Sequence, residues 1–223
     1  MLQKLKPTIA IIDSGIGGLS VLNQLIDRYH SGNYIYFADN LYMPYGNKTK
    51  QFIAQRVKNI IQFLKGKYNP DVIILACNTA SSILKDEKID NVVCMQFSKA
   101  YRYLATPLTK RILKGVDILA DSTLARNIEN NIFNREKLEK IIKKHIKKNK
   151  LDSLESLVLG CTHYELVAEI FEKYCPNTQI INNSKYILNN IIYSPQQDEC
   201  NVEYILSKQS LKYCQKLMRL TRR

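Results

Sequence analysis

The fold is decided by two similar stretches, IILACNT at residues 73–79 and LVLGCTH at residues 157–163. Each begins with an apolar run typical of a buried strand and continues with a small residue, a cysteine and polar residues that can begin a helix. Because the two stretches follow one pattern, they indicate an internal duplication in which each half of the chain carries one thiol. These thiols are Cys77 and Cys161.

Short apolar runs alternate with longer amphipathic stretches on both sides of these segments. This alternation is typical of parallel sheets covered by helices, so the chain is predicted to be an α/β protein. Its 223 residues suffice for one large domain or two small ones. Strands are predicted at residues 8–12, 34–37, 72–75, 116–119, 157–159 and 179–181, and helices at residues 19–29, 51–64 and 163–174.

Polar segments follow four of the predicted strands. Ligands of parallel sheets bind beyond the carboxyl ends of the strands, so these segments are the candidates for a binding site. They are DSG at residues 13–15, residues 39–46, CNT at residues 77–79 and CTH at residues 161–163.

A cysteine at the end of a strand that opens a helix lies among free backbone N–H groups and at the positive end of the helix dipole. We therefore expect the pKa of such a thiol to fall from about 8.5 towards neutrality. Inversion of an α-carbon without a cofactor needs a base on one face and an acid on the other, and Cys77 and Cys161 meet this need. His163 could assist Cys161, and Asp13 could assist Cys77. The alternative is that each cysteine is a small core residue.

The glycine cluster GIGG at residues 15–18 suggests a second hypothesis, dinucleotide binding, because it follows a strand. Ser20 stands where the third glycine of that motif would fall, and the hypothesis leaves the two cysteine segments unexplained. No cysteines and histidines have zinc-site spacing, so we expect neither a metal nor a cofactor.

Four motifs together resemble the glutamate racemase type of the aspartate/glutamate racemase family, in their order and approximate positions and over most of the chain. The resemblance implies cofactor-independent interconversion of L- and D-glutamate, which supplies D-glutamate for peptidoglycan of the cell wall. It implies that Cys77 and Cys161 are the acid/base catalysts. The motifs are DSGIGGLS at residues 13–20, PYG at residues 44–46, ACNTAS at residues 76–81 and LGCTHY at residues 159–164. The implied substrate-binding residues are Asp13, Ser14, Tyr45, Gly46, Asn78, Thr79, Thr162 and His163.

The fold implied by the resemblance has two pseudo-symmetric halves, each a mainly parallel sheet flanked by helices, with the active site in the cleft between them. The C-terminal segment returns to the first half. We accordingly expect a first domain of residues 1–95 plus 205–223 and a second, shortened domain of residues 96–204. A homodimer is an open alternative to a monomer.

The second half departs from the family pattern at several points. CMQF at residues 94–97 stands where a Gly-Val-Ile-Glu-Pro type segment is usual, and NNS at residues 182–184 replaces an Asp-Ser-Gly type turn. Glu165 replaces the proline that normally follows the His-Tyr pair. Residues 127–157 look short, so we expect a strand and an acidic residue near the cleft to be replaced by a lysine-rich helix.

The net charge of +13 is concentrated in that helix. Residues 135–150 hold eight Lys or Arg and two Glu, while Leu138, Ile141, Ile142 and Ile146 recur at helical spacing. We interpret this pattern as an amphipathic helix with a solvated basic face and do not expect nucleic-acid binding, because no recognition motif accompanies the lysines.

The six cysteines have no paired spacing, which indicates a reducing compartment, and no apolar stretch is long enough to cross a bilayer. We expect a cytoplasmic protein. Two alternatives remain open at this point. One is an aspartate racemase of the same family, and the other is a binding protein that keeps the cleft without turnover and uses the lysine-rich helix to hold an acidic partner.

Overall fold

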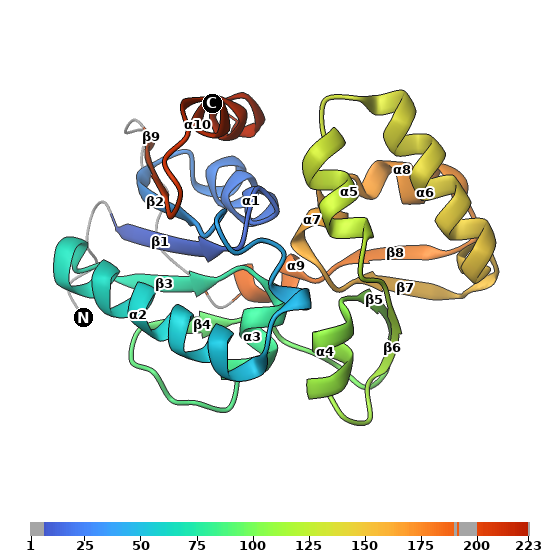
Figure 1. Cartoon of the computed structure of the whole chain (residues 1–223), viewed down its shortest axis with the longest axis horizontal. Coiled ribbons are helices and arrows are strands. Elements are labelled where there is room, and N and C mark those ends of the chain that lie inside the picture. Colours follow the sequence, from blue (N-terminus) through green and yellow to red (C-terminus); the bar gives the residue numbers. More distant parts are fainter. Residues whose placement is uncertain (1–6, 190, 192–199, 223) are drawn as a thin grey trace.

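The computed structural model describes residues 7–189, 191 and 200–222, and it contains two sheets placed side by side (Figure 1). Every strand pair is parallel in both sheets, and helices flank them. The predicted α/β class with two mainly parallel sheets is therefore confirmed.

The first sheet has five strands in the order β4-β3-β1-β2-β9. β1 lies at its centre, with Ile11 opposite both Tyr36 of β2 and Ile74 of β3. The strands are β1 (Thr8–Asp13), β2 (Gly32–Ala38), β3 (Val72–Leu75), β4 (Val92–Cys94) and β9 (Cys200–Leu206).

The second sheet has four strands in the order β6-β5-β7-β8. They are β5 (Arg102–Ala105), β6 (Asp117–Ala120), β7 (Ser156–Leu159) and β8 (Gln179–Asn182). In the first sheet the strand order reverses between β1 and β3, and in the second it reverses between β5 and β7. Ligands of open parallel sheets bind outside the strand ends at such a reversal. The two sheets thus present equivalent sites, one after β3 and one after β7.

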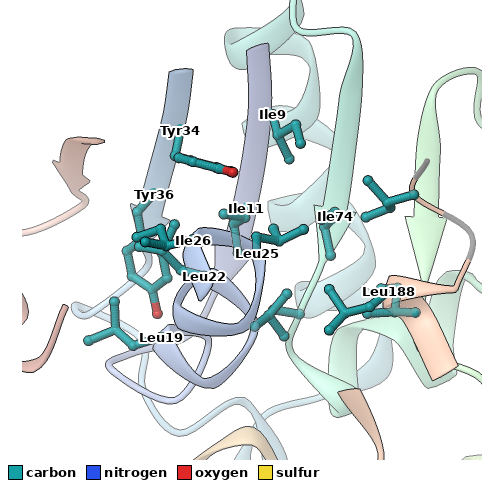
Figure 2. Packing of buried hydrophobic residues seen from close by; sticks show 14 of the residues in the cluster. Ile9, Ile11, Leu19, Leu22, Leu25, Ile26, Tyr34, Tyr36, Ile74 and Leu188 are labelled. Atoms are coloured by element: carbon teal, nitrogen blue, oxygen red, sulfur yellow. The ribbon is translucent and has the colours of Figure 1, made fainter. Parts of the chain in front are cut away.

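Alternate residues of β1 face opposite sides of its sheet. Ile9 and Ile11 pack with helix α1 (Leu19–Tyr29), as Figure 2 shows, while Ala10 and Ile12 pack with helix α2 (Lys50–Tyr68). A strand buried on both faces reads as a continuous apolar run, which is why the sequence predicts β1 and β3 well. This half also contains α3 (Asn78–Leu84), α10 (Leu211–Leu220) and the one-turn η1 (Tyr45–Asn47).

Around the second sheet, α5, α6, α7 and α8 pack on one face, and α4 packs with α3 of the first half through Leu108. Leu138, Ile142 and Ile146 of α6 are buried and its lysines face outward, which confirms the predicted amphipathic helix. The bounds are α4 (Pro107–Ile112), α5 (Leu124–Asn131), α6 (Arg135–Asn149), η2 (Leu151–Ser153), α7 (Thr162–Glu165) and α8 (Ala168–Tyr174). Helix α9 (Ser184–Leu188) follows β8 but packs in the core of the first half through Ile187 and Leu188.

Some predicted elements differ from those observed. The helix predicted at residues 163–174 is two helices, α7 and α8, because Val167 leaves the helical conformation (φ −129°, ψ 26°). Strands β4, β5 and β9 were not predicted.

The C-terminal segment pairs with the first sheet through β9, which lies beside β2. The expected domain limit between residues 204 and 205 falls inside this strand. Residues 1–6, 190, 192–199 and 223 of the expected domains lie outside the described residues.

Candidate active site

A small closed cavity lies where the carboxyl ends of the two sheets meet. Its volume is about 10 Å³, which is about enough for one water molecule. Nine of the ten predicted site residues line it, and the tenth, Asp13, accepts a hydrogen bond from Thr162 of the lining. The lining residues are Ser14, Pro44, Tyr45, Gly46, Cys77, Asn78, Thr79, Thr106, Ala125, Cys161, Thr162 and His163.

Cys77 lies at the cavity wall that belongs to the first half. It follows β3, precedes the first residue of α3 and is buried. Burial raises the pKa of its thiol, and the negative charge of Asp13 raises it further, while backbone hydrogen bonds at Thr79 and Ala80 lower it by less. The expected lowering of this pKa is therefore wrong for Cys77 in the closed cavity, because the loss of water outweighs the helix N-terminus.

Cys161 occupies the equivalent position in the second half. It follows β7, precedes the first residue of α7 and is buried. His163 hydrogen-bonds to it. The two cysteines thus reach one cavity from equivalent strand ends.

His163 is held by a carboxylate that the sequence analysis did not identify. Oε2 of Glu129 lies 2.6 Å from Nε2 of His163, and both side chains are buried. Burial lowers the pKa of His163, but the hydrogen bonds to Cys161 and Glu129 outweigh it and hold that pKa well above the ordinary value. The expectation that this region lacks an acidic residue near the cleft is wrong, because α5 supplies one ahead of the lysine-rich helix.

Glu129 also contacts the first half of the chain. The backbone N–H of Ile16 donates to its Oε2 over 3.1 Å, and Nζ of Lys216 lies 3.1 Å from its Oε1. Burial raises the pKa of Glu129, but the His163 hydrogen bond and the charges of His163 and Lys216 lower it to about 2. Glu129 is therefore an ionised carboxylate shared between the two halves.

Asp13 joins the two halves at a second point. Its Oδ1 accepts from the backbone N–H of Gly15 over 2.9 Å, and its Oδ2 accepts from the hydroxyl of Thr162 over 3.0 Å. Burial raises the pKa of Asp13, and the charge of His163 and these hydrogen bonds oppose that rise.

The glycine cluster allows the halves to approach closely. A Cβ atom at Gly17 would lie 2.5 Å from Nδ1 and 2.8 Å from the backbone N of His163. Both distances are shorter than the contacts that Cβ atoms make with other residues in proteins. This packing accounts for the glycines without a dinucleotide.

An amide group at the cavity has unused hydrogen-bonding capacity. Oδ1 of Asn78 accepts from Nδ2 of Asn183 over 2.6 Å. Nδ2 of Asn78 is buried, and no residue in the described part of the chain bonds to it. A donor in this position suits an anionic ligand.

Two further clusters shape the cavity wall. The hydroxyl of Thr79 lies 3.0 Å from that of Thr106 and 3.2 Å from that of Thr109. The hydroxyl of Tyr45 donates over 2.6 Å to Asp39, which Arg56 also binds. Tyr45 therefore lines the cavity with its ring while Asp39 holds its hydroxyl.

Sequence reasoning missed Thr106, Glu129 and Asn183. Thr106 follows β5 by one residue as Ser14 follows β1, so the duplication would identify it once β5 is known. Asn183 lies in the NNS segment noted as a departure from the family pattern, whereas no local signal indicates Glu129.

Across the described ranges, no helix is long and apolar enough to cross a membrane.

Comparison with known proteins gives glutamate racemases among the similar relatives. The chain is 30% identical over 188 residues to glutamate racemase 3 of Caldanaerobacter subterraneus subsp. tengcongensis, covering 74% of this chain and 69% of the relative. It is 32% identical over 199 residues to a glutamate racemase of Clostridium botulinum, covering 77% of each. No protein-family model matches the sequence.

Solved structures resemble the fold across nearly its whole length. Glutamate racemase from Thermus thermophilus in complex with β-chloro-D-alanine superposes with a TM-score of 0.79 at 22% identity, covering 98% of this chain and 94% of that one. Glutamate racemase from Campylobacter jejuni subsp. jejuni superposes with a TM-score of 0.75 at 22% identity, covering 97% of this chain and 100% of that one. The resemblance predicted from the four motifs is confirmed.

Proposed function

Because this chain belongs to the glutamate racemase family, we propose that it interconverts L-glutamate and D-glutamate without a cofactor, with Cys77 and Cys161 moving the α-proton. One observation carries the mechanism. Two buried cysteines, at equivalent ends of two parallel sheets, line one cavity.

The two thiols have different surroundings, which suits opposite starting roles. The raised pKa of Cys77 keeps its proton in place, so this thiol is ready to act as the acid. His163 hydrogen-bonds to Cys161, so we assign this thiol the role of the base. Cys161 takes the α-proton from one face of the substrate carbon, and Cys77 gives its proton to the other face. The thiols then hold exchanged protonation states, ready for the reverse direction.

The groups around the thiols suit an amino acid. The unused amide of Asn78 and the hydroxyls of Thr79 and Thr162 can bind carboxylate oxygens. Asp13 suits the ammonium group, and Ser14, Tyr45 and Gly46 complete the wall that would surround the substrate. His163 faces Cys161 and thus orients the base.

Substrate entry requires the halves to separate. A cavity of about 10 Å³ cannot admit an amino acid. Separation would break the Thr162–Asp13 and Ile16–Glu129 hydrogen bonds. On closure around the substrate the Ile16–Glu129 bond re-forms, whereas the Thr162 hydroxyl donates to the substrate carboxylate and leaves Asp13 to the ammonium group. The site is in this sense assembled by closure.

We place this reaction in the cytoplasm, where it supplies D-glutamate for peptidoglycan. The parts that would move are the two expected domains, residues 1–95 plus 205–223 and residues 96–204, except that residues 200–204 of β9 and helix α9 pack with the first part and would move with it. The oligomeric state, monomer or homodimer, is decided by the molar mass that light scattering measures.

The test is incubation of the purified protein with L-glutamate, and separately L-aspartate, in deuterated water without added cofactor. We expect α-deuterium incorporation and loss of optical rotation with glutamate, and neither with a Cys77→Ser/Cys161→Ser double variant. Exchange with aspartate alone would keep the mechanism and change the substrate. Absence of exchange with both would contradict catalysis and favour a binding protein without turnover.

A further inference from the structure

Lys216 contacts the active-site carboxylate from a helix remote in sequence. It lies on α10, whose Leu217 packs into the core of the first half, and Figure 1 shows α10 on that half and α5 on the other. Its Nζ lies 3.1 Å from Oε1 of Glu129 and also donates to the backbone carbonyl of Glu129. The Lys216 side chain is 18% exposed and that of Glu129 is 3% exposed, so this ion pair is largely shielded from water.

The two oxygens of Glu129 have separate partners. Oε1 receives Lys216, while Oε2 receives His163 and the backbone N–H of Ile16. Lys216 therefore fixes the rotation of the Glu129 carboxylate about its Cγ–Cδ bond. The position of Oε2 that results fixes the orientation of the His163 imidazole ring.

The partners also divide between the halves. His163 belongs to the second half, as Glu129 does, whereas Ile16 and Lys216 belong to the first. When the halves separate, Glu129 keeps His163 and loses the other two contacts.

We propose that Lys216 is a positioning residue that acts on His163 through Glu129, and does so only when the two halves are closed. The catalytic meaning of this inference rests on the proposed racemase function. With Lys216 in place, the buried group of Lys216, Glu129 and His163 carries one net positive charge beside Cys161. Without it, the group is neutral when His163 is charged, and a thiolate at Cys161 is less stabilised.

Other titratable groups surround this carboxylate. They are Tyr213 on α10, and Tyr36 and Asp13 of the first sheet. Burial raises the pKa of both tyrosines, so they remain neutral near pH 7. Lys216 is thus the cation that the first half brings to this cluster.

The chain offers a matched control. Lys212 lies one turn earlier on α10 and is exposed. Both lysines border a groove between α5 and α10 of about 1090 Å³, so their replacement by methionine leaves no void in the core.

The experiment compares Lys216→Met, Lys216→Arg and Lys212→Met with the unaltered protein, by the pH profile of kcat/KM for glutamate and by the ¹⁵N spectrum of His163. We expect the acidic limb to move up by about one pH unit in Lys216→Met, with a changed Nε2 signal. Lys216→Arg should keep most of the original pH profile and of the original Nε2 signal of His163. Lys212→Met should change neither the profile nor the signal. An unchanged profile and spectrum in Lys216→Met would overturn the inference.

The spectrum separates this inference from the proposed function. If the unaltered protein exchanges no substrate, the racemase proposal fails. A His163 signal that still shifts in Lys216→Met would then support the positioning role, and an unshifted signal would refute it.

Discussion

The hydroxyl of Thr162 donates a 3.0 Å hydrogen bond to Oδ2 of Asp13, which joins the first residue of α7 to the last residue of β1. Both side chains are buried, and they belong to different sheets. The two halves are therefore held together by the groups that surround the cavity, and changes at these groups affect both stability and the site.

Thr162→Val removes the donor and keeps the shape. A hydrogen bond to a charged group contributes about 1.5–3 kcal/mol, so we expect the free energy of unfolding at pH 7 to fall by about that amount. Urea denaturation measures it. Thr162→Ser keeps the hydroxyl and is the control. Equal stability of the valine variant and the unaltered protein would show that the bond contributes nothing.

Cys77→Ser and Cys161→Ser test the proton relay one side at a time. Serine is a much weaker acid than cysteine, so we expect each variant to lose about 10²–10⁴-fold in racemisation rate. The measurement is the optical rotation of a glutamate solution. Cys175→Ser is the control, since Cys175 is buried but lies away from the cavity. Near-normal rates in either active-site variant would end the two-thiol mechanism.

The sequence predicts the central strands and the residues directly after them, because these positions carry local signals. β1 and β3 read as continuous apolar runs, and Cys77 and Cys161 follow such runs. β9 was missed because it is a half-exposed edge strand in which Asn201 and Glu203 face solvent.

The missed site residues depend on tertiary structure. Glu129 reaches His163 across 34 positions and Lys216 across 87, and no periodicity links helices so far apart. The direction of the pKa shift of Cys77 could not be predicted from the sequence either, because it depends on how completely the closed halves exclude water from the thiol.

The lysine-rich helix gives a test of the second half as a packed unit. Ile142 of α6 is fully buried, so Ile142→Ala should lower the free energy of unfolding by about 2–5 kcal/mol. Lys144 lies two residues further along and is exposed, and Lys144→Ala should stay within about 0.5 kcal/mol. Urea denaturation of both variants tests this contrast. Equal effects would contradict an amphipathic helix whose basic face is merely solvated.

Glu165 gives the stability a distinctive dependence on pH. It stands where the family pattern has proline, and its carboxylate accepts from the backbone N–H of Ser184 over 3.0 Å. Its Oε2 has no partner among the described residues. Burial raises the pKa of Glu165 from 4.5 to about 7, although the hydrogen bonds from Ser184 oppose the rise.

A raised pKa means that the folded protein binds the proton more tightly than the unfolded chain does. The contribution of Glu165 is therefore most favourable below pH 4.5, decreases as the pH rises towards about 7, and is constant above it. The total change corresponds to about 3 kcal/mol.

Glu165→Gln keeps a neutral side chain of the same shape at every pH. We expect its free energy of unfolding to match that of the unaltered protein near pH 4.5 and to exceed it by up to about 3 kcal/mol at pH 8. Glu155→Gln, at an exposed carboxylate, should leave the profile unchanged. Urea denaturation across this range makes the comparison. A constant difference between the Glu165→Gln variant and the unaltered protein would mean that Glu165 keeps the same proton affinity in the folded and unfolded chain.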